Sequence, residues 1–350
     1  MAFLLYEGFE GLVSPTELPY FCEVLTEAPS SQMVPGGAVG NAYSVNASSG
    51  DAKLRYDISS VGVGPTFITG FRLRLTEVSS VAGTVQFRVD FNDGANDSAW
   101  LEVRSIGPAD RWNIYLGYGS TTIATASALV QANDYAYIEW KTTLNNTTGG
   151  SFEVKVDEVT ISSNSGITTS QGNPSSINHI DFTFTGGVGS VELDDIYLYD
   201  DTTSDQNDFE GDIVIFGLSP NEDISTGWTP NVAGADNYTM VDDPTVDEDV
   251  TYVQAATSGA KDLYGFEDLP ASIVASIVAV ELRMIGRLVT AGSGTVRQVT
   301  KSGTTEGFVS ETLSKQGYRG FKSRFFTNPD TGVAWTQSEI NSMQAGIEIP

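Results

Sequence analysis

Runs in which apolar and polar residues alternate constrain this chain more than any other feature. Residues 71–75 read FRLRL and residues 85–91 read VQFRVDF. A period of two is typical of a strand with one face on a core and the other in water. Clusters of Asn, Ser, Thr and Gly at 145–150 and 162–166 predict turns. Further strands are expected at 112–118, 135–143, 152–156, 177–184 and 191–199. Roughly ten strands in the first half predict a two-sheet sandwich.

The remainder of the chain predicts a smaller β-rich domain. Residues 201–212 are polar and acidic, and they predict an extended linker because like charges repel. Thr336 and Glu339 have the spacing of a capping box, so a short helix is expected over 336–345. Strands are expected at 213–218, 251–254, 278–284, 296–299, 307–313, 318–326 and 347–349. The predicted fold class is all-β, with a sandwich over 1–200 and a second domain over 213–350 that carries one helix.

Composition limits the partners of the chain. The net charge is -27, with 23 acids and 9 bases in 1–200, and 22 acids and 9 bases in 201–350. Such a field argues against nucleic acid or an anionic membrane as a partner. The single cysteine, Cys22, excludes an intramolecular disulfide and a zinc cluster. No signal peptide precedes the first strand and no run is long enough to span a bilayer, so we expect a soluble protein made in the cytoplasm.

Three segments of the first half resemble the late strands of concanavalin-like, laminin-G-type jelly rolls. They read YIEWK at 137–141, GSFEVKVD at 150–157 and VELDDIYLYD at 191–200, and EGFE at 7–10 fits the usual first strand. The resemblance implies that the first and last strands pair. Glu158 stands where such proteins commonly have a glycine, which alters the tight turn.

Many jelly rolls of this type bind sugars or calcium, which suggests two sites. Asp194, Asp195 and Asp200 are the candidate calcium ligands, and the alternative is a polar strand end with one carboxylate capping a turn. Residues 112–116 alternate so that Trp112, Ile114 and Leu116 face a core. Tyr115 then faces outward and is the candidate for glycan contact. No other cofactor is expected.

The second half resembles a domain of structural proteins of tailed bacteriophages. Its landmarks are Gly-Asp at 211–212, Pro-Asn at 220–221, Trp-Thr-Pro at 228–230, and Asn-Pro-Asp-Thr-Gly at 328–332 followed by Ala-Trp-Thr at 334–336. The resemblance implies a non-enzymatic structural protein of the virion, and we expect a peripheral, tail-associated position such as a fibre or a tail or neck accessory. Its partners would be other virion proteins, copies of itself and a host surface glycan. The residues expected at assembly contacts are Trp228, Tyr238, Trp335, Arg319 and Arg324.

Two alternatives stay open beside the tail component. One is a capsid decoration protein of the same phage class, and the other is a free lectin-like carbohydrate-binding protein. Within the second half, residues 201–268 hold 16 acids and one base, whereas 269–350 hold 6 acids and 8 bases. These segments either interleave within one subunit or dock between copies, and docking would weaken with salt.

Catalytic material is scarce in the sequence. His179 is the only histidine and no Gly-x-Ser-x-Gly motif is present, so His179 is expected to be structural. Glu153 and Asp157 have the parity of a glycosidase pair but lack flanking aromatic residues. The acidic loop at 242–249 lacks the glycine and terminal glutamate of an EF-hand. We therefore expect no enzymatic activity.

Overall fold

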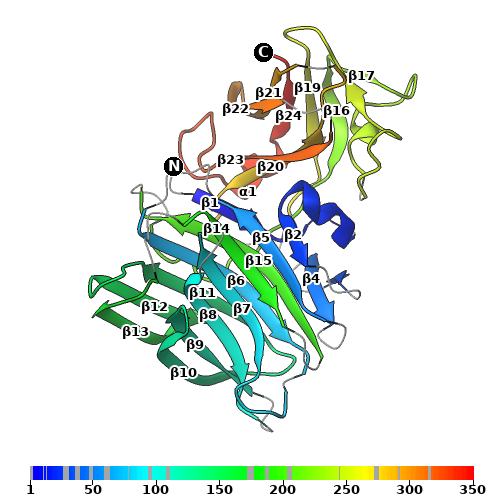
Figure 1. Ribbon diagram of the computed structural model, residues 1–350. Helices are drawn as coiled ribbons and strands as arrows, with labels where there is room; N and C mark the ends of the chain where they lie inside the picture. Colours follow the sequence, from blue (N-terminus) through cyan, green and yellow to red (C-terminus); the bar gives the residue numbers. More distant parts are fainter. Residues whose placement is uncertain are drawn as a thin grey trace. The chain divides into compact units, whose positions relative to one another are not determined.

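The computed structural model describes residues 3–10, 12, 14–26, 31–35, 40–46, 50–58, 64–77, 79–93, 97–107, 111–171, 177–185, 189–202, 207–243, 245–271, 276–290, 292–313 and 317–350. The chain divides into two compact units, Met1–Phe216 and Gly217–Pro350. Both units consist almost entirely of strands (Figure 1).

The first unit is built from two antiparallel sheets. Sheet A has the order β13-β12-β11-β6-β15-β4-β3, and β1 pairs with β15. Sheet B has the order β10-β9-β8-β7-β14-β5-β2. The strands of sheet A are β1 (Phe3–Glu7), β3 (Gln32–Pro35), β4 (Asn41–Asn46), β6 (Thr66–Leu75), β11 (Tyr135–Thr143), β12 (Gly150–Val156), β13 (Val159–Ile167) and β15 (Ser190–Asp200). Those of sheet B are β2 (Glu23–Thr26), β5 (Ala52–Asp57), β7 (Val85–Asn92), β8 (Asp97–Ser105), β9 (Arg111–Tyr118), β10 (Thr121–Gln131) and β14 (His179–Phe184), and a 3-10 helix, η1 (Pro15–Tyr20), precedes β2.

Aromatic side chains join the two sheets. The Phe67 ring of sheet A stacks on Phe91 of sheet B with centroids 4.6 Å apart, and Phe71 lies 5.5 Å from Phe87. Trp140 lies 5.1 Å from Phe91. All five side chains are buried, and all occupy inward positions of the alternating runs. The sandwich predicted from alternation is therefore confirmed.

The strand predictions for the first half are largely confirmed. Strand β11 has the predicted bounds, and β1 pairs with β15 as the jelly-roll resemblance implied. The estimate of about ten strands was too low, since the described residues of this unit form fifteen. The turn predicted at 162–166 was wrong, because these residues lie within β13. As an edge strand paired only with β12, β13 can accommodate small polar residues.

The turn between β12 and β13 forms without a glycine. Asp157 and Glu158 have φ values of 47° and 66°, the left-handed conformation that a two-residue hairpin turn requires. The Oδ1 atom of Asp157 accepts a hydrogen bond of 2.8 Å from the backbone N–H of Tyr137. This bond anchors the turn at the position where the sequence departs from the jelly-roll pattern.

Residues 207–212 of the linker expected at 201–212 are bound to the first unit, together with residues 213–216, whereas residues 203–206 lie outside the described residues. Residues 207–216 belong to the first unit and lie on the outward face of sheet A. Arg72 donates to Asp212 Oδ1 at 2.5 Å and to Ile213 O at 3.1 Å, and the N–H of Ile215 donates to Asp195 Oδ1 at 2.8 Å. These backbone groups bond to side chains of the sheet, which explains why the strand expected at 213–218 does not form.

The second unit contains three smaller sheets. A five-stranded sheet has the order β16-β19-β24-β21-β22, and the pairs β17-β18 and β20-β23 form the others. Their strands are β16 (Pro220–Thr226), β17 (Thr229–Pro230), β18 (Val253–Gln254), β19 (Lys261–Phe266), β20 (Val280–Gly286), β21 (Gly294–Ser302), β22 (Thr305–Leu313), β23 (Arg319–Phe325) and β24 (Gln344–Glu348). A 3-10 helix, η4 (Tyr238–Met240), follows β17. Within the described parts of the chain, no helix has the length and apolar character needed to cross a membrane.

The predicted helix forms, but it is shorter than expected. Helix α1 (Gln337–Asn341) begins after Thr336, whose side chain accepts from the N–H of Glu339. The Glu339 side chain accepts from the N–H of Thr336 at 2.8 Å, which completes the capping box. Residues 344 and 345, expected to be helical, lie in β24 instead, where they pair with β19 and β21.

Acidic and basic segments of the second unit interleave within the fold. Strands β16 and β19 come from the acidic segment, and β19 pairs directly with β24 of the basic segment. Lys261 of the acidic segment bonds to Glu306 of the basic segment at 2.6 Å, and Arg287 of the basic segment bonds to Asp249 of the acidic segment. The intramolecular alternative therefore accounts for the segregation of charge along the chain.

Candidate functional site

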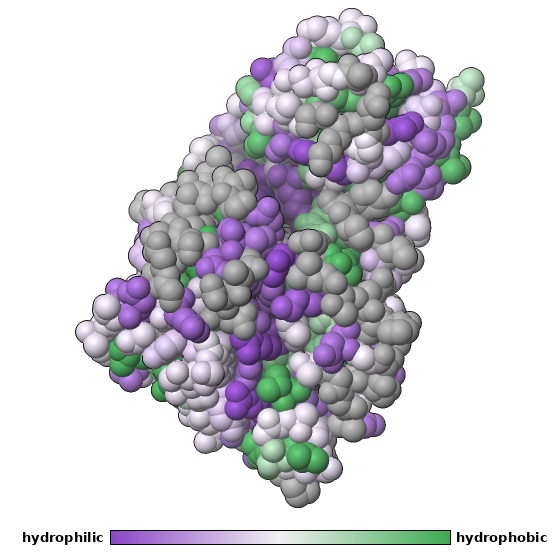
Figure 2. All heavy atoms as spheres, viewed as in Figure 1, coloured by the Kyte–Doolittle hydropathy of each residue, from purple (hydrophilic) through white to green (hydrophobic). Residues whose placement is uncertain are grey.

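Sheet B places charged and aromatic side chains side by side on its outward face. Because β5, β14, β7 and β8 are neighbours, their registers align Arg55, Asp181, Asp90 and Trp100 in one row. The next row aligns Lys53, Thr183, Arg88, Glu102 and Tyr115. The intervening residues of each strand are apolar and point into the core. On the side of this unit seen in Figure 2, strongly hydrophilic residues gather in a band.

Four cations of this face are held by three carboxylates. Arg55 bonds to Asp181 through Nε and Nη2, both at 2.7 Å, and Lys53 reaches the same carboxylate at 3.2 Å. On the other side, Arg88 donates to Asp90 at 2.5 Å and to Glu102 at 2.9 Å. Arg104 also donates to Glu102, through Nε at 2.6 Å. We call the four cations Lys53, Arg55, Arg88 and Arg104, with the carboxylates that hold them, the basic face.

In the basic face the cations are more exposed to solvent than the carboxylates that they contact. The side chains of Lys53, Arg55, Arg88 and Arg104 are 17–30% exposed, whereas those of Asp90, Asp181 and Glu102 are at most 6% exposed. Burial alone would raise the pKa of Asp181, but the hydrogen bond from Arg55 and the charge of Lys53 outweigh it, and the pKa is lowered. Asp181 therefore stays ionised and holds Arg55 and Lys53 in place, while solvent meets mainly the guanidinium and ammonium groups of these pairs.

Aromatic rings complete the basic face. Arg88 and Arg104 lie over the Trp100 ring at 5.3 and 5.7 Å, and Arg104 lies over Tyr115 at 4.4 Å. Trp100 lies against Gly117, where a Cβ atom would come within 2.2 Å of the ring. Trp100 is buried, so its ring serves to support the arginines, whereas Tyr115 is only half-buried and faces outward as predicted.

His179 lies on the same outward face, two residues before Asp181 in β14. Its ring is half-buried, and Nδ1 has no hydrogen-bond partner among the residues that the structure describes. The structural role expected for His179 therefore stays a prediction, since its position beside the basic face suits a polar ligand equally well.

The three candidate calcium ligands do not form a metal site. Asp195 pairs with Arg72 at 2.9 Å, while Asp200 accepts from Thr202 at 3.0 Å and Gly64 at 3.3 Å. Asp194 accepts from the N–H of Asp195 at 2.8 Å, and burial raises its pKa to about 10. A protonated carboxyl is a poor cation ligand, and no metal-binding group of three or more such residues occurs in the described ranges.

The predicted assembly residues are mostly engaged within the second unit. Trp335 is 3% exposed, packs against Ile340 and Met343, and donates to the carbonyl of Phe325 at 3.0 Å. It is therefore a core residue, which corrects its assignment to an assembly surface. The other four are half-buried and have partners in the unit. The side chains of Trp228 and Arg324 donate to the Ala260 carbonyl and to Glu281, and Arg319 lies over the Phe321 ring. Tyr238 donates through its backbone N–H to Asp223.

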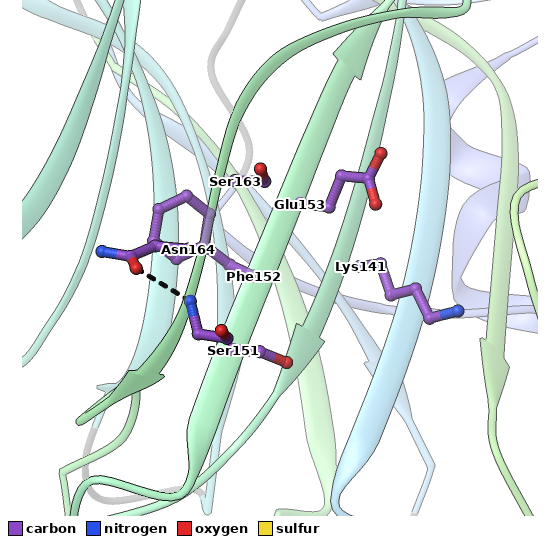
Figure 3. Close-up of a pocket in the computed structure, with 7 residues that line it drawn as sticks. Lys141, Ser151, Phe152, Glu153, Ser163 and Asn164 are labelled. Carbon is purple, nitrogen blue, oxygen red and sulfur yellow. Dashed lines mark hydrogen bonds between the residues drawn. The ribbon is translucent and has the colours of Figure 1, made fainter.

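A pocket lies at the other sheet. It has a volume of about 510 Å³ and is lined by Lys141, Ser151, Phe152, Glu153, Ser163, Asn164 and Ser165. Figure 3 shows Lys141 and Glu153 extending from neighbouring strands, and the register of β11 and β12 places these two residues directly opposite one another. Glu153 accepts from Thr160 at 2.8 Å. The lining is polar except for Phe152, which suits a small hydroxylated ligand.

Sequence reasoning found Tyr115 but missed the cations around it. Arg88, Asp90, Glu102 and Arg104 all occupy the polar positions of alternating runs, which sequence alone treats as solvated. The signal was the recurrence of arginine at those positions in a strongly acidic chain. Pairing between strands far apart in sequence, such as β5 and β14, was needed to gather them.

Comparisons with known proteins find similarity among solved structures. No family model matches, and no curated protein matches. Among solved structures, an endo-β-1,4-glucuronan lyase from Trichoderma reesei is 11% identical, with 56% of this chain and 94% of that chain covered and a TM-score of 0.37. Domain 4 of AbnA, an arabinanase from Geobacillus stearothermophilus, is 11% identical, with 57% of this chain and 92% of that chain covered and a TM-score of 0.39. An alginate lyase of Aplysia kurodai is 10% identical over 57% and 99%, at 0.41.

By name, two of these proteins are polysaccharide lyases and the third is a domain of an arabinanase. The expectation of a protein without enzymatic activity is corrected by them, because polysaccharide lyases stand among the similar structures. The fold thus gives no ground for excluding catalysis. None of the similar structures named here is a phage protein, so the virion assignment stays a prediction.

Proposed function

We propose that this chain is a carbohydrate-binding protein whose first unit binds an acidic polysaccharide on the basic face. The observation that carries the proposal is the layering of that face, with four cations above buried carboxylates. In a chain of net charge -27, a long anion would be repelled by most of the surface. In the ion pairs of this face the four cations are the more exposed members, and the three carboxylates that hold them are buried.

The chemistry of the face suits a uronic acid polymer. Guanidinium groups recognise carboxylates through paired hydrogen bonds, and the buried partners hold Arg55, Arg88 and Arg104 in position before a ligand arrives. Tyr115 presents a ring on which the apolar face of a sugar can pack. Glucuronan and alginate, named in the titles of similar structures, belong to this class of polymer, but the proposal depends on the charges of this chain.

Binding of a polyuronate by the intact chain and by an Arg88→Gln/Arg104→Gln variant tests the proposal. Each lost charge-assisted hydrogen bond costs about 1.5–3 kcal/mol, so the variant should bind at least about tenfold more weakly. Arg287→Gln is the matched control, because Arg287 of the second unit also pairs with a carboxylate, that of Asp249, and lies over the ring of Tyr318. The control should bind like the parent, and raising the salt concentration should weaken the parent.

The same titration separates binding from cleavage. A lyase leaves an unsaturated uronate whose ultraviolet absorbance grows with time, so absorbance should be followed alongside heat or mobility. Equal affinity of the parent and the double variant for the polyuronate, or tighter binding of a neutral glucan than of the polyuronate by the parent, would refute the proposal.

A virion setting remains a separate prediction for the second unit. Its proposed partners are other virion proteins and copies of the same chain, and its proposed location is the particle. Neighbouring genes for portal or capsid proteins, or the chain itself in purified particles, would support that setting. The copy number per particle would then separate a tail position from capsid decoration.

A further inference from the structure

An acidic segment of the chain lies along the outward face of sheet A. We call residues 207–216 (NDFEGDIVIF) the strap. Its Asp208 bonds to Lys141 at 3.1 Å, and its Asp212 bonds to Arg72 at 2.5 Å. Between them, Phe209 lies 4.1 Å from the ammonium group of Lys155. The strap thus sets carboxylates and a ring against cations from β6, β11 and β12.

The backbone of the strap is held by buried side chains. The N–H of Gly211 donates to Glu139 at 2.9 Å, and the N–H of Ile215 donates to Asp195 at 2.8 Å. Asp208 and Asp212 themselves are 75% and 42% exposed, so their ion pairs lie at the rim. Main-chain amides therefore occupy the deep positions, where any extended chain with suitably placed polar groups would find partners.

The surface beneath the strap is a platform of tyrosines. The rings of Tyr137, Tyr197 and Tyr199 stack in succession, with centroids 6.5 and 4.9 Å apart. Gly70 leaves room for this arrangement, because a Cβ atom there would lie 2.2 Å from the Tyr197 ring. Tyr197 donates to Glu139 Oε1 at 2.5 Å. Stacked rings with hydroxyl and carboxylate groups at their edges suit sugar rings and their hydroxyls.

Glu139 has an unfilled bonding position at the centre of this platform. The residue is 1% exposed, and its Oε2 atom has no hydrogen-bond partner among the described residues. A buried oxygen without a hydrogen-bond donor lowers the stability of the fold, so a purely structural role does not explain its presence here. Burial raises the pKa of Glu139, with the hydrogen bond from Tyr197 acting in the opposite direction. A ligand hydroxyl would supply the missing donor.

The pocket in Figure 3 adjoins the strap through Lys141. This side chain lines the pocket and also bonds to the strap at Asn207 O and Asp208. Glu153 and Ser163, on the outward side of the next two strands, continue the polar surface beyond the strap. The outward face of sheet A is thus one surface, covered over β6, β11 and β15 and hollowed over β12 and β13.

We propose that the outward face of sheet A is a second binding site for an acidic glycan, built on Glu139, Tyr197 and Arg72, and that the strap closes it as an intramolecular competitor. The proposal takes its ligand class from the proposed function. The acids of the strap occupy the places of sugar carboxylates at Lys141 and Arg72, and the pocket is the open end of the site. When a site is open only part of the time, its apparent affinity falls by the open fraction.

The test uses a glucuronic acid oligosaccharide and the full chain with Arg88→Gln/Arg104→Gln, so that the contribution of the basic face is reduced by at least about tenfold. In this background, Asp208→Lys/Asp212→Lys reverses the strap charges that face Lys141 and Arg72. These side chains are exposed, so the fold should persist. Affinity should rise by about tenfold as the open fraction grows. In the Asp208→Lys/Asp212→Lys variant, the amide hydrogens of Gly211 and Ile215 should also exchange faster than in the background. Adding Glu139→Gln to this variant should abolish the gain in affinity.

Each outcome decides the proposal. Faster exchange of the two amides with unchanged affinity would show that the uncovered face binds no acidic glycan. Unchanged exchange would show that the acids do not hold the strap, which also overturns the competition. A gain that survives Glu139→Gln places the binding elsewhere. If the basic-face variants alone fail to weaken binding, the proposed function falls while this inference stands on the strap variants.

Discussion

The ion pairs of Asp181 yield the most sharply defined stability prediction. Asp181→Asn removes the negative charge that Arg55 contacts through two bonds of 2.7 Å and that Lys53 contacts at 3.2 Å. Breaking a fully buried pair costs about 3–5 kcal/mol. Asp181 is 1% exposed, but Arg55 and Lys53 are 17% and 30% exposed and regain water. We therefore expect the free energy of unfolding of the first unit to fall by about 2–3 kcal/mol near pH 7.

The pH dependence of this loss has a defined sign. The pKa of Asp181 is lowered in the fold from its ordinary value of 3.8. Its ionised form therefore stabilises the fold above that value, and the contribution disappears as the pH falls through the folded pKa. Protonated Asp181 resembles asparagine. The difference in stability between parent and Asp181→Asn should thus be full near neutral pH and should vanish at a pH below the folded pKa.

Hydrogen exchange of the β14 amides measures this difference, because global unfolding of a chain with two units is not a two-state process. Asp134→Asn removes an exposed carboxylate of the loop between β10 and β11 and should change the stability by less than about 0.5 kcal/mol. Equal stability of Asp181→Asn and parent near neutral pH would refute the reasoning. So would a difference that grows on acidification.

Four further changes test other parts of the structure. Thr336→Ala should lower the stability of the second unit by about 1 kcal/mol through loss of the helix cap, measured by thermal unfolding against a Thr305→Ala control. Glu158→Gly should raise the stability of the first unit by about 0.5–1 kcal/mol, because it relieves a left-handed backbone, and an unchanged melting temperature would contradict this. Gly70→Ala should cost about 1–3 kcal/mol or more, because its Cβ atom meets the Tyr197 ring, and denaturant titration would show it. Asp194→Asn should match the parent below pH 3.8 and exceed it in stability as the pH rises toward 10, since the raised pKa of Asp194 means that its ionisation opposes folding.

Alternation of apolar and polar residues predicted the sandwich because each strand carries that information within itself. Strand β11 was predicted with its observed bounds, and the inward positions of Trp112 and Leu116 were predicted from parity alone. The same parity placed Tyr115 outside. The alternation within a strand does not predict which other strands pair with it. Sheet order decides whether an outward arginine meets water or a carboxylate, and it depends on the folding of the whole chain.

The basic face shows the consequence of that gap. Arg55 and Asp181 are 126 residues apart in sequence and lie opposite one another only because β5 pairs with β14. The candidate calcium ligands failed for a related reason. Neighbours in sequence, Asp194 and Asp195 separate at a bulge where Asp195 has φ 47°, and Arg72 claims the second carboxylate. Reasoning from neighbours in sequence therefore predicted a calcium site that does not form, and it did not predict the basic face.

The acidic residues of the strap were predicted to belong to an extended linker because only the repulsion among them was considered. An acidic run isolated in water extends through self-repulsion, which is the basis on which 201–212 was predicted as a linker. Arg72 and Lys141, distant in sequence, turn the same acids into attachment points, and Glu139 and Asp195 bind its backbone. Repulsion within a segment predicts its behaviour only where the fold offers no opposite charge. In this chain the outward faces of both sheets offer it, so the acidic segment and an acidic ligand are expected to seek the same kind of surface.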